Sequence, residues 1–536
     1  MTASSRLDGL AAQTIEALRQ SSQALQGRDV AQAIRAARQA AQAAPEHPEV
    51  LRRLALALVA QGPSEEAVAA IARAVAQRPD DGVLANAQAI VLQRSGLQDA
   101  ALDALGRAYA LQPHSAEIAY NYGRVLGLRF DSEKALKVLE HAVALAPEQR
   151  DARATLAMVL GQLGRSAESI AQYRYLLQRD PRDIGVWSAL GALRGVRFSA
   201  DDLAAIERLA TQAGLQFESR VRIGFTLAEA YDDNARYAEA YSEYCQANAL
   251  VRTRIPWNAN AHSAEVDGIL GAFERPWLDT DAKRGDGIVF IVSLPRAGST
   301  LIEQILASHP QVSAGDERLD LLEIIAAEGG RRGTHLAKWA PLASAEDWQR
   351  LGRRYLERMQ SVRGAARVFT DKLPGNWLWL GAAMAMLPGA VVVDCRRDPL
   401  ETAWSCFRQT FAGGTQDFSY DIESIGAFCK DHDRAMRHWR ALYPQRMRTQ
   451  VYESLLADAQ TQTRELLAFC GLQFDPLCLR FYENRRTVRT ISAVQVREPL
   501  RADTAHGKKY GTLLDPLRAT LGLPPFAETD ATSIAE

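Results

Sequence analysis

The sequence predicts a chain in two parts: an all-helical N-terminal half built from repeats, followed by an α/β domain with a central parallel sheet. Three observations support this prediction. Prolines recur at a fixed step of 34 residues through the first part. From Gly287 onward, short apolar runs of strand type alternate with helical patterns, which implies a parallel sheet with helices on both faces. At the start of this second part, a buried strand leads into a small polar loop and a helix.

The overall composition bounds the class of protein. The 536 residues suffice for two to four domains, and 47% apolar with 24% charged residues is ordinary for a soluble globular protein. The formal net charge of −1 gives no global attraction for nucleic acids or for an acidic membrane surface. No apolar run approaches the roughly 18 residues that a membrane-spanning helix requires. We therefore expect no nucleic-acid partner and no membrane span.

The cysteines indicate a reducing compartment. The six cysteines are scattered and form no Cys-x-x-Cys pair, a pattern that argues against a structural zinc site and against a disulfide framework. The first residues lack a basic segment followed by an apolar core, so we expect no signal peptide. We expect a cytoplasmic protein that requires no metal.

The first 255 residues are rich in alanine and have a helical pattern throughout. The recurring prolines are Pro45, Pro79, Pro113, Pro147 and Pro181. Two rows of alanines keep the same step: Ala33, Ala67, Ala101 and Ala135, and Ala40, Ala74, Ala108 and Ala142. A period of 34 residues, with small residues where helices cross and a proline after the second helix, resembles the tetratricopeptide repeat. Two looser helical pairs, roughly residues 182–215 and 218–252, look like degenerate or capping units.

The domain bounds follow from these patterns. We expect a tetratricopeptide-repeat domain over residues 1–255, a linker over 256–286, a catalytic domain over 287–526 and a disordered tail over 527–536. The repeats either form a structural stalk or present a concave groove that holds a peptide or protein. We expect the groove, but the sequence does not identify its ligand.

The loop at the start of the second part has the layout of an anion site. Val289–Leu294 is an apolar run of strand type, Pro295–Ser299 is a turn of small residues, and Thr300–Ala307 has apolar residues at helical spacing. This layout directs backbone N–H groups and the positive end of a helix at an anion. The loop resembles a P-loop, but no Gly-x-x-x-x-Gly-Lys-Ser/Thr fits, and Arg296 stands where such a loop has its lysine. A phosphosulfate suits this loop better than a magnesium-bound triphosphate.

Three later stretches are polar where a plain α/β domain would not need polar residues. They are Gly315–Arg318, Phe369–Asn376 and Cys395–Ser405. In the third of these, a strand ends at two arginines, and a proline marks the first turn of a helix. Arg397 at the strand end and Ser405 two turns into the helix are placed to bind one phosphate together.

With these motifs in the right order, residues 287–526 resemble a sulfotransferase that uses 3′-phosphoadenosine-5′-phosphosulfate (PAPS). The closest resemblance is to the tyrosylprotein sulfotransferase branch and its bacterial relatives fused to tetratricopeptide repeats. In that family the first loop binds the 5′-phosphosulfate, and the matching residues are Pro295, Arg296, Ala297, Gly298, Ser299 and Thr300. Arg397 and Ser405 keep the family spacing for the 3′-phosphate. The segments 491–499 and 507–510 resemble the segment that closes over the donor, which adds Ser492 and either Lys508 or Lys509.

The resemblance implies a reaction and roles for residues. PAPS would be the donor, and a sulfuryl group would pass in line to a hydroxyl acceptor. Arg296 would hold the sulfonate, Lys372 would steady the leaving phosphate, and Glu317 would be the general base. Asp316 is the competing base. No metal is required, since arginine and lysine already neutralise the donor.

Other interpretations compete with this one. A nucleotide kinase of related fold is the first rival, and a repeat scaffold whose catalytic half has decayed is the second. His309 before Pro310 is a turn residue rather than the base, and we assign Trp377, Trp379, Trp404 and the segment Tyr452–Leu455 to packing.

One departure from the family affects the acceptor. The tyrosylprotein enzymes recognise acidic peptides with arginines two and six residues after the base, whereas this chain has Leu319 and Glu323 at those positions. Peptide tyrosine, a glycan and a small hydroxyl compound therefore all stay open as acceptors.

Overall fold

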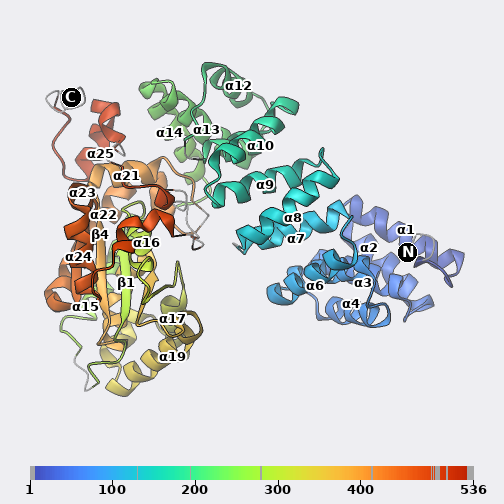
Figure 1. Cartoon of the computed structure of the whole chain (residues 1–536), viewed down its shortest axis with the longest axis horizontal. Helices are drawn as coiled ribbons and strands as arrows, with labels where there is room; N and C mark the ends of the chain where they lie inside the picture. The colour runs from blue at the N-terminus through green and yellow to red at the C-terminus, as the bar shows by residue number, and fades with distance from the viewer. Residues whose placement is uncertain are drawn as a thin grey trace. The chain divides into compact units, whose positions relative to one another are not determined.

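The computed structural model forms two compact units, Met1–Leu176 and Leu177–Glu536 (Figure 1). It describes residues 6–129, 131–193, 195–277, 281–411, 414–484, 486, 488, 495–501 and 505–527. The predicted tail lies outside these residues beyond position 527.

The first unit consists of helices that pack in consecutive pairs. Their bounds are α1 Ala12–Gln26, α2 Val30–Ala43, α3 Pro48–Gln61, α4 Glu65–Gln77, α5 Gly82–Arg94, α6 Gln98–Leu111, α7 Ala116–Leu128, α8 Ser132–Leu145, α9 Arg150–Gln162 and α10 Ser166–Arg179, the last of which runs across the boundary between the units. The recurring prolines each lie two residues after the last residue of α2, α4, α6, α8 or α10, because proline cannot continue a helix. The helical repeat predicted for this half is confirmed.

The small residues of the repeat lie where helices approach most closely. Ala33, Ala67, Ala101 and Ala135 are all 0% exposed. Gly123 has the same function in its unit, since a Cβ there would lie 2.6 Å from the side chain of Leu139. The fixed step in the sequence therefore records a fixed spacing between packed helices.

The second unit begins with two further helical pairs. They are α11 Ile184–Gly191, α12 Ala200–Ala210, α13 Phe217–Asp233 and α14 Tyr237–Arg252. These pairs belong to the same compact unit as the α/β domain.

The segment expected to be a linker contains a helix, α15 Ala259–Gly271. Asn258 caps it by accepting a hydrogen bond from the backbone N–H of Ala261. Val266 and Ile269 are buried in the core of the α/β domain, and α15 packs against helix α22. The sequence signal was weak because these two apolar residues alone mark the buried face.

The described residues of the α/β domain include a parallel sheet of five strands. They are β1 Ile288–Ser293, β2 Val312–Ala314, β3 Val368–Lys372, β4 Val391–Arg396 and β5 Met447–Val451, in the order β2-β3-β1-β4-β5. Every residue of β1 and β3 is buried. Phe290 and Val292 pack into a different core cluster from Val289 and Ile291, so both faces of the sheet are covered. The predicted fold class is confirmed.

Helices and short 3-10 turns connect and cover the strands. The helices are α16 Ser299–Ala307, α17 Asp320–Arg332, α18 Leu336–Trp339, α19 Ala345–Arg363, α20 Leu380–Met386, α21 Pro399–Phe407, α22 Ile422–Leu442, α23 Tyr452–Ala457, α24 Ala459–Phe469 and α25 Asp515–Thr520. The 3-10 turns are η2 Ala340–Leu342, η3 Pro374–Trp379, η4 Asp417–Tyr420, η5 Pro444–Arg446, η6 Pro476–Glu483, η7 Gln495–Arg497 and η8 Gly507–Leu514.

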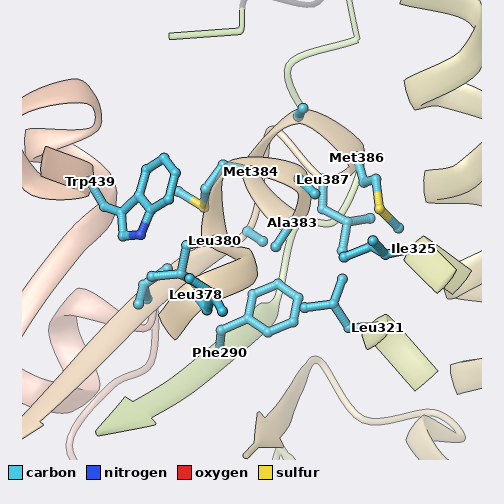
Figure 2. Close-up of a cluster of buried hydrophobic side chains, with 14 of the residues drawn as sticks. Phe290, Leu321, Ile325, Leu378, Leu380, Ala383, Met384, Met386, Leu387 and Trp439 are labelled. Carbon is cyan, nitrogen blue, oxygen red and sulfur yellow. The ribbon is translucent and has the colours of Figure 1, made fainter. Parts of the chain in front are cut away.

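One face of the sheet carries a large apolar core (Figure 2). Phe290 of β1 lies there with Leu321 and Ile325 of α17, Met384 of α20 and Trp439 of α22. Such burial, at about 25 cal/mol per Å² of apolar surface, is the main stabilising term of the domain. This core fixes β1, β3 and β4 as a rigid base, and the loops at their carboxyl ends carry the polar motifs.

Candidate functional site

The loop between β1 and α16 has an unusual backbone. Arg296 has φ 68° and Gly298 has φ 95°, both in the left-handed region. A non-glycine residue in this region costs about 1–2 kcal/mol, and such strain collects at functional sites. Gly298 is the N-cap of α16 and has no side chain to satisfy the first N–H groups of the helix. This geometry turns backbone N–H groups toward an anion.

The start of the loop also contains an unsatisfied polar atom. Ser293 ends β1 and is 0% exposed, and its Oγ has no hydrogen-bond partner among the described residues. Ser299 and Thr300 follow at the start of α16 and are both buried. Pro295 and Ala297, between these polar groups, are buried as well. The hydroxyl groups of Ser293, Ser299 and Thr300 fit the oxygens of a sulfonate or phosphate.

The polar stretch Phe369–Asn376 lies beside the loop after β1, because β3 pairs with β1. Ile291 is in register with Lys372, the last residue of β3. The Lys372 side chain is 0% exposed, and its Nζ donates a hydrogen bond of 2.8 Å to Oε1 of Glu317. A buried ammonium requires such a partner. The Glu317 side chain is 39% exposed and is therefore accessible from solvent.

The turn that carries Glu317 is held by a buried carboxylate. Asp316 has φ 57°, and its backbone N–H donates to Oε1 of Glu303 at 3.1 Å. The Thr370 hydroxyl donates to the same oxygen at 3.0 Å. Burial raises the pKa of the Glu303 carboxyl, and Lys372 and then Arg486 act against this rise. Glu303 therefore holds the backbone of the turn that carries Asp316 and Glu317.

Arg486 completes this cluster. Its Nη1 lies 2.7 Å from Oδ1 of Asp316, and its Nη2 lies 3.0 Å from Oε2 of Glu303. Its Nε donates to Gln304 at 2.8 Å. Sequence reasoning missed Glu303 and Gln304, although polar residues within the apolar face of α16 were the available signal.

The loop after β1 also contacts the polar stretch Cys395–Ser405, which starts at the end of β4. Arg296 Nε donates to Ser405 Oγ of α21 at 3.1 Å, across a separation of 109 residues. The Cys406 thiol donates to the carbonyl of Pro295 at 3.5 Å. These contacts bring together the loops after β1 and β4, which are neighbours in the sheet. Arg296, Lys372 and Arg397 thus come from the carboxyl ends of three adjacent strands, the usual place for a ligand.

Tyr452, which the sequence assigned to packing, lies beside two residues of the candidate site. Its ring lies 5.3 Å from the Arg397 guanidinium, and a Cβ at Gly298 would lie 3.5 Å from it. Glu453 accepts a hydrogen bond from the backbone N–H of Asp398 at 3.0 Å. Only Leu455 of this segment is fully buried, so the packing assignment holds for that residue.

The C-terminal segment approaches the same helix, α21. The Glu401 carboxylate accepts hydrogen bonds from the backbone N–H groups of His506 at 2.8 Å and Gly507 at 2.7 Å. Arg397 Nη2 lies 3.9 Å from Glu401 Oε2. Lys508 and Lys509 follow directly in η8 and are exposed. Ser492 lies outside the described residues.

The histidine and tryptophans that the sequence assigned to a turn and to packing lie in such places. His309 is 7% exposed; its Nδ1 accepts from the N–H of Gln311, and its Nε2 lies 3.2 Å from the Gln473 carbonyl oxygen, so it is a turn residue. Trp377 and Trp404 are each 1% exposed, and Trp379 packs against the apolar core.

Among the described residues, no helix is long and apolar enough to cross a membrane. Within the same ranges, no group of three or more His, Cys, Asp and Glu side chains is arranged to hold a metal ion.

Comparison with known proteins supports the two-part organisation. Residues 24–90 and 131–184 match the tetratricopeptide repeat. Residues 289–476 match the sulfotransferase family.

One curated relative gives a weaker comparison than the family matches do. An uncharacterized protein of Aquifex aeolicus is 28% identical over 330 residues, which covers 59% of this chain and 43% of that protein. The chain thus spans less than half the length of this curated relative.

Solved structures with some similarity include a tetratricopeptide repeat protein from Parabacteroides merdae (17% identical, 47% of this chain and 96% of that one, TM-score 0.34). Another is the MamA protein (20% identical, 32% of this chain and 93% of that one, TM-score 0.28). The family matches support a chain in which tetratricopeptide repeats precede a sulfotransferase-family domain.

Proposed function

We propose that the protein transfers a sulfuryl group from PAPS to a hydroxyl acceptor. The observation that carries the proposal is the meeting of three cations, Arg296, Lys372 and Arg397, at the carboxyl ends of adjacent strands, with an exposed carboxylate beside them. The match of residues 289–476 to the sulfotransferase family supports the same reaction class.

The loop after β1 would hold the reacting end of the donor. Arg296, Ser299, Thr300 and the N–H groups around Pro295, Ala297 and Gly298 would bind the sulfonate and the 5′-phosphate. Lys372 would contact the bridging oxygen and stabilise the charge that develops on the leaving phosphate. Because Lys372 is buried, its charge acts in a medium of low dielectric, where such stabilisation is strongest.

The proton of the acceptor needs a base. As the bond between sulfur and the bridging oxygen breaks and the bond to the acceptor oxygen forms, the acceptor hydroxyl would give its proton to Glu317. The product of the donor would be adenosine 3′,5′-bisphosphate. The rival base Asp316 is committed to Arg486 at 2.7 Å, which favours Glu317.

The other end of the site would bind the 3′-phosphate. Arg397 follows β4, and Ser405 of α21 accepts a hydrogen bond from Arg296 of the loop. Glu401 of the same helix holds Gly507, the residue before Lys508 and Lys509. Ser492 remains part of this proposal from the sequence. Cationic side chains together with serine hydroxyls suit a phosphate dianion.

The acceptor would be a hydroxyl compound without strong negative charge. Arg318 pairs with Asp320 at 2.8 Å, and Arg358 pairs with Glu323 at 2.8 Å, so carboxylates of α17 neutralise the arginines near the base. A peptide tyrosine with neutral flanks, a glycan or a small hydroxyl compound would meet this requirement. The repeat groove would hold a peptide or protein that carries the acceptor or a partner of the enzyme.

The test is calorimetry with adenosine 3′,5′-bisphosphate and, in parallel, with ATP and magnesium. We expect tight binding of the first and weak binding of the second. Arg397→Ala should lower the affinity for the first at least about tenfold, while the exposed Arg437→Ala on α22 should leave it unchanged. Equal binding of both nucleotides would favour a kinase, and binding of neither would favour a scaffold; either result overturns the proposal.

A further inference from the structure

The last helical pair, α13 and α14, contacts both segments that carry the proposed 3′-phosphate ligands. Asn248 of α14 is 1% exposed and donates a hydrogen bond of 2.9 Å to the carbonyl of Phe407, the last residue of α21. Trp404 of α21 packs against Tyr244 of α14, with 5.6 Å between ring centroids. All of these residues belong to one compact unit.

Asp232 of α13 lies at the centre of these contacts. One of its carboxylate oxygens accepts a hydrogen bond of 3.1 Å from Nη2 of Arg408, the residue that follows α21. The other oxygen accepts a hydrogen bond of 2.7 Å from the hydroxyl of Tyr510 in η8. Only 9% of the Asp232 side chain and 17% of the Arg408 side chain are exposed.

The two partners of Asp232 are close in sequence to the proposed ligands. Arg408 comes three residues after Ser405, and Tyr510 comes directly after Lys508 and Lys509. The Tyr510 ring is 3% exposed and packs on Trp404 at 4.7 Å. Glu401 fixes the start of η8 and Asp232 fixes Tyr510, so the two lysines lie between two anchored points.

A charge-assisted hydrogen bond in a largely buried place is worth more than an exposed one. Burial disfavours the charge of Arg408, but Tyr244, Asp232 and Tyr510 outweigh burial and raise the pKa of the guanidinium. The carboxylate of Asp232 is therefore the counter-charge that keeps this junction together. Its loss would loosen the end of α21 and the lysine segment at once.

We propose that Asp232 is a positioning residue for the 3′-phosphate end of the donor site, so that the last helical pair is part of the binding machinery. This inference rests on the proposed function. The ligand class is a nucleotide with a 3′-phosphate. Asp232 does not contact the ligand; it sets in advance the geometry of Ser405, Lys508 and Lys509, which reduces the ordering cost of binding.

The decisive quantity is selectivity for the 3′-phosphate. Calorimetry on the full chain gives the affinities for adenosine 3′,5′-bisphosphate and for adenosine 5′-phosphate, which lacks that group. In Asp232→Asn the ratio of the two affinities should fall about tenfold relative to the wild type, as expected when a charged hydrogen bond is lost. A purely structural role would lower both affinities alike or neither.

A matched control and a second variant keep the test decisive. Glu218→Gln removes a carboxylate of the same helix, but its 3.2 Å ion pair with Arg254 is exposed, so the ratio should not change. Tyr510→Phe keeps the ring and removes only the hydroxyl, and it should lower the ratio even if Asp232→Asn fails to fold. The double variant should be little worse than the poorer single one, since both substitutions weaken the contact between the same two side chains.

The outcomes separate this inference from the proposed function. A wild-type protein that binds neither nucleotide, or binds both equally, contradicts the sulfotransferase proposal itself. A wild type that discriminates, together with an unchanged ratio in both single variants, contradicts only the role of Asp232.

Discussion

The two ends of the candidate site hold their lysines in opposite ways. At the end proposed to bind the sulfuryl group, Lys372 is 0% exposed and pairs with Glu317 at 2.8 Å. At the 3′-phosphate end, Lys508 and Lys509 are exposed on a short 3-10 turn. A buried charge interacts in a low dielectric and is already positioned, whereas an exposed charge is screened by water and salt.

This difference separates chemistry from binding. Charge that is buried and fixed before the reaction lowers the barrier, because no reorganisation is needed as charge develops on the leaving group. Exposed lysines contribute mainly to affinity and to attraction at low ionic strength. We therefore expect substitutions at the sulfuryl end to lower the rate, and substitutions at the 3′-phosphate end to lower donor affinity.

The two ends also differ in which residues hold their polar groups in place. Glu303 and Arg486 hold the turn of Glu317 through ion pairs within the α/β domain. The lysine segment instead depends on Glu401 and on Asp232, a residue of the helical half of the unit. Thus the proposed sulfuryl end is fixed locally, while the proposed 3′-phosphate end is coupled to the helices that precede the domain.

The largest effect is expected for Lys372→Met. Transfer of labelled sulfate should fall about 10²–10³-fold, because the developing charge on the leaving phosphate loses its buried cation. Affinity for adenosine 3′,5′-bisphosphate should change only a few-fold. The Glu317 carboxylate tolerates the loss of its partner because its side chain is 39% exposed.

Lys338→Met is the matched control for this experiment. Lys338 lies on α18 and is exposed, so its replacement should leave both rate and affinity unchanged. If Lys372→Met weakens nucleotide binding as much as it slows transfer, the separation between the two ends is wrong.

A smaller but still large effect is expected for Glu317→Gln. The amide cannot accept the acceptor proton, so transfer should fall at least about 10²-fold while nucleotide binding persists. Asp316→Asn should have the weaker effect on rate, since Asp316 is already committed to Arg486. Labelled sulfate transfer measured side by side decides between them: full activity of Glu317→Gln, or a greater loss in Asp316→Asn, moves the base away from Glu317.

The fold was predictable because its signals are local or periodic. The prolines and small residues at a step of 34 mark packed helices, and the apolar run before Pro295 marks a strand buried on both faces. The places of Arg397, just after a strand, and of Ser405, on the helix that follows, were also predictable, since both lie on one strand–loop–helix element. Their role as phosphate ligands stays a prediction. In each case the residues that act together are close in sequence or share one element.

The rest depends on contacts that no local pattern encodes. Arg486 reaches Glu303 across 183 residues, and Tyr510 reaches Asp232 across 278. Tyr452 looked like a packing residue because its neighbour Leu455 is one, but its ring lies beside Arg397. Which polar residues support the site is decided by how distant segments fold together.

The smallest effect concerns two titratable residues, Asp371, which precedes Lys372 in the chain, and His506, which precedes Lys508 and Lys509. Burial favours the neutral form of each, so it raises the pKa of the acid and lowers the pKa of the histidine. Burial raises the pKa of Asp371, next to Lys372, to about 7, although the hydrogen bond from Tyr355 acts against the rise. Burial, together with Arg408 and Lys509, lowers the pKa of His506 to about 4. Asp371 therefore binds a proton in the folded state that it releases on unfolding, and its contribution to stability is lost as pH rises from about 4 to 7. His506 contributes stability that is lost as pH falls from about 6.5 to 4, so the two slopes oppose each other.

Asp371→Asn removes one of the two slopes and keeps the polar group that meets Tyr355 and Asn376. Urea unfolding between pH 4.5 and 7 should show that the variant gains stability with rising pH more steeply than the wild type does. His506→Asn should shift the balance the other way, because it leaves only the slope of Asp371. Parallel curves for Asp371→Asn and wild type would mean that Asp371 is ionised in the folded protein, where Tyr355 and Asn376 would then hold its charge.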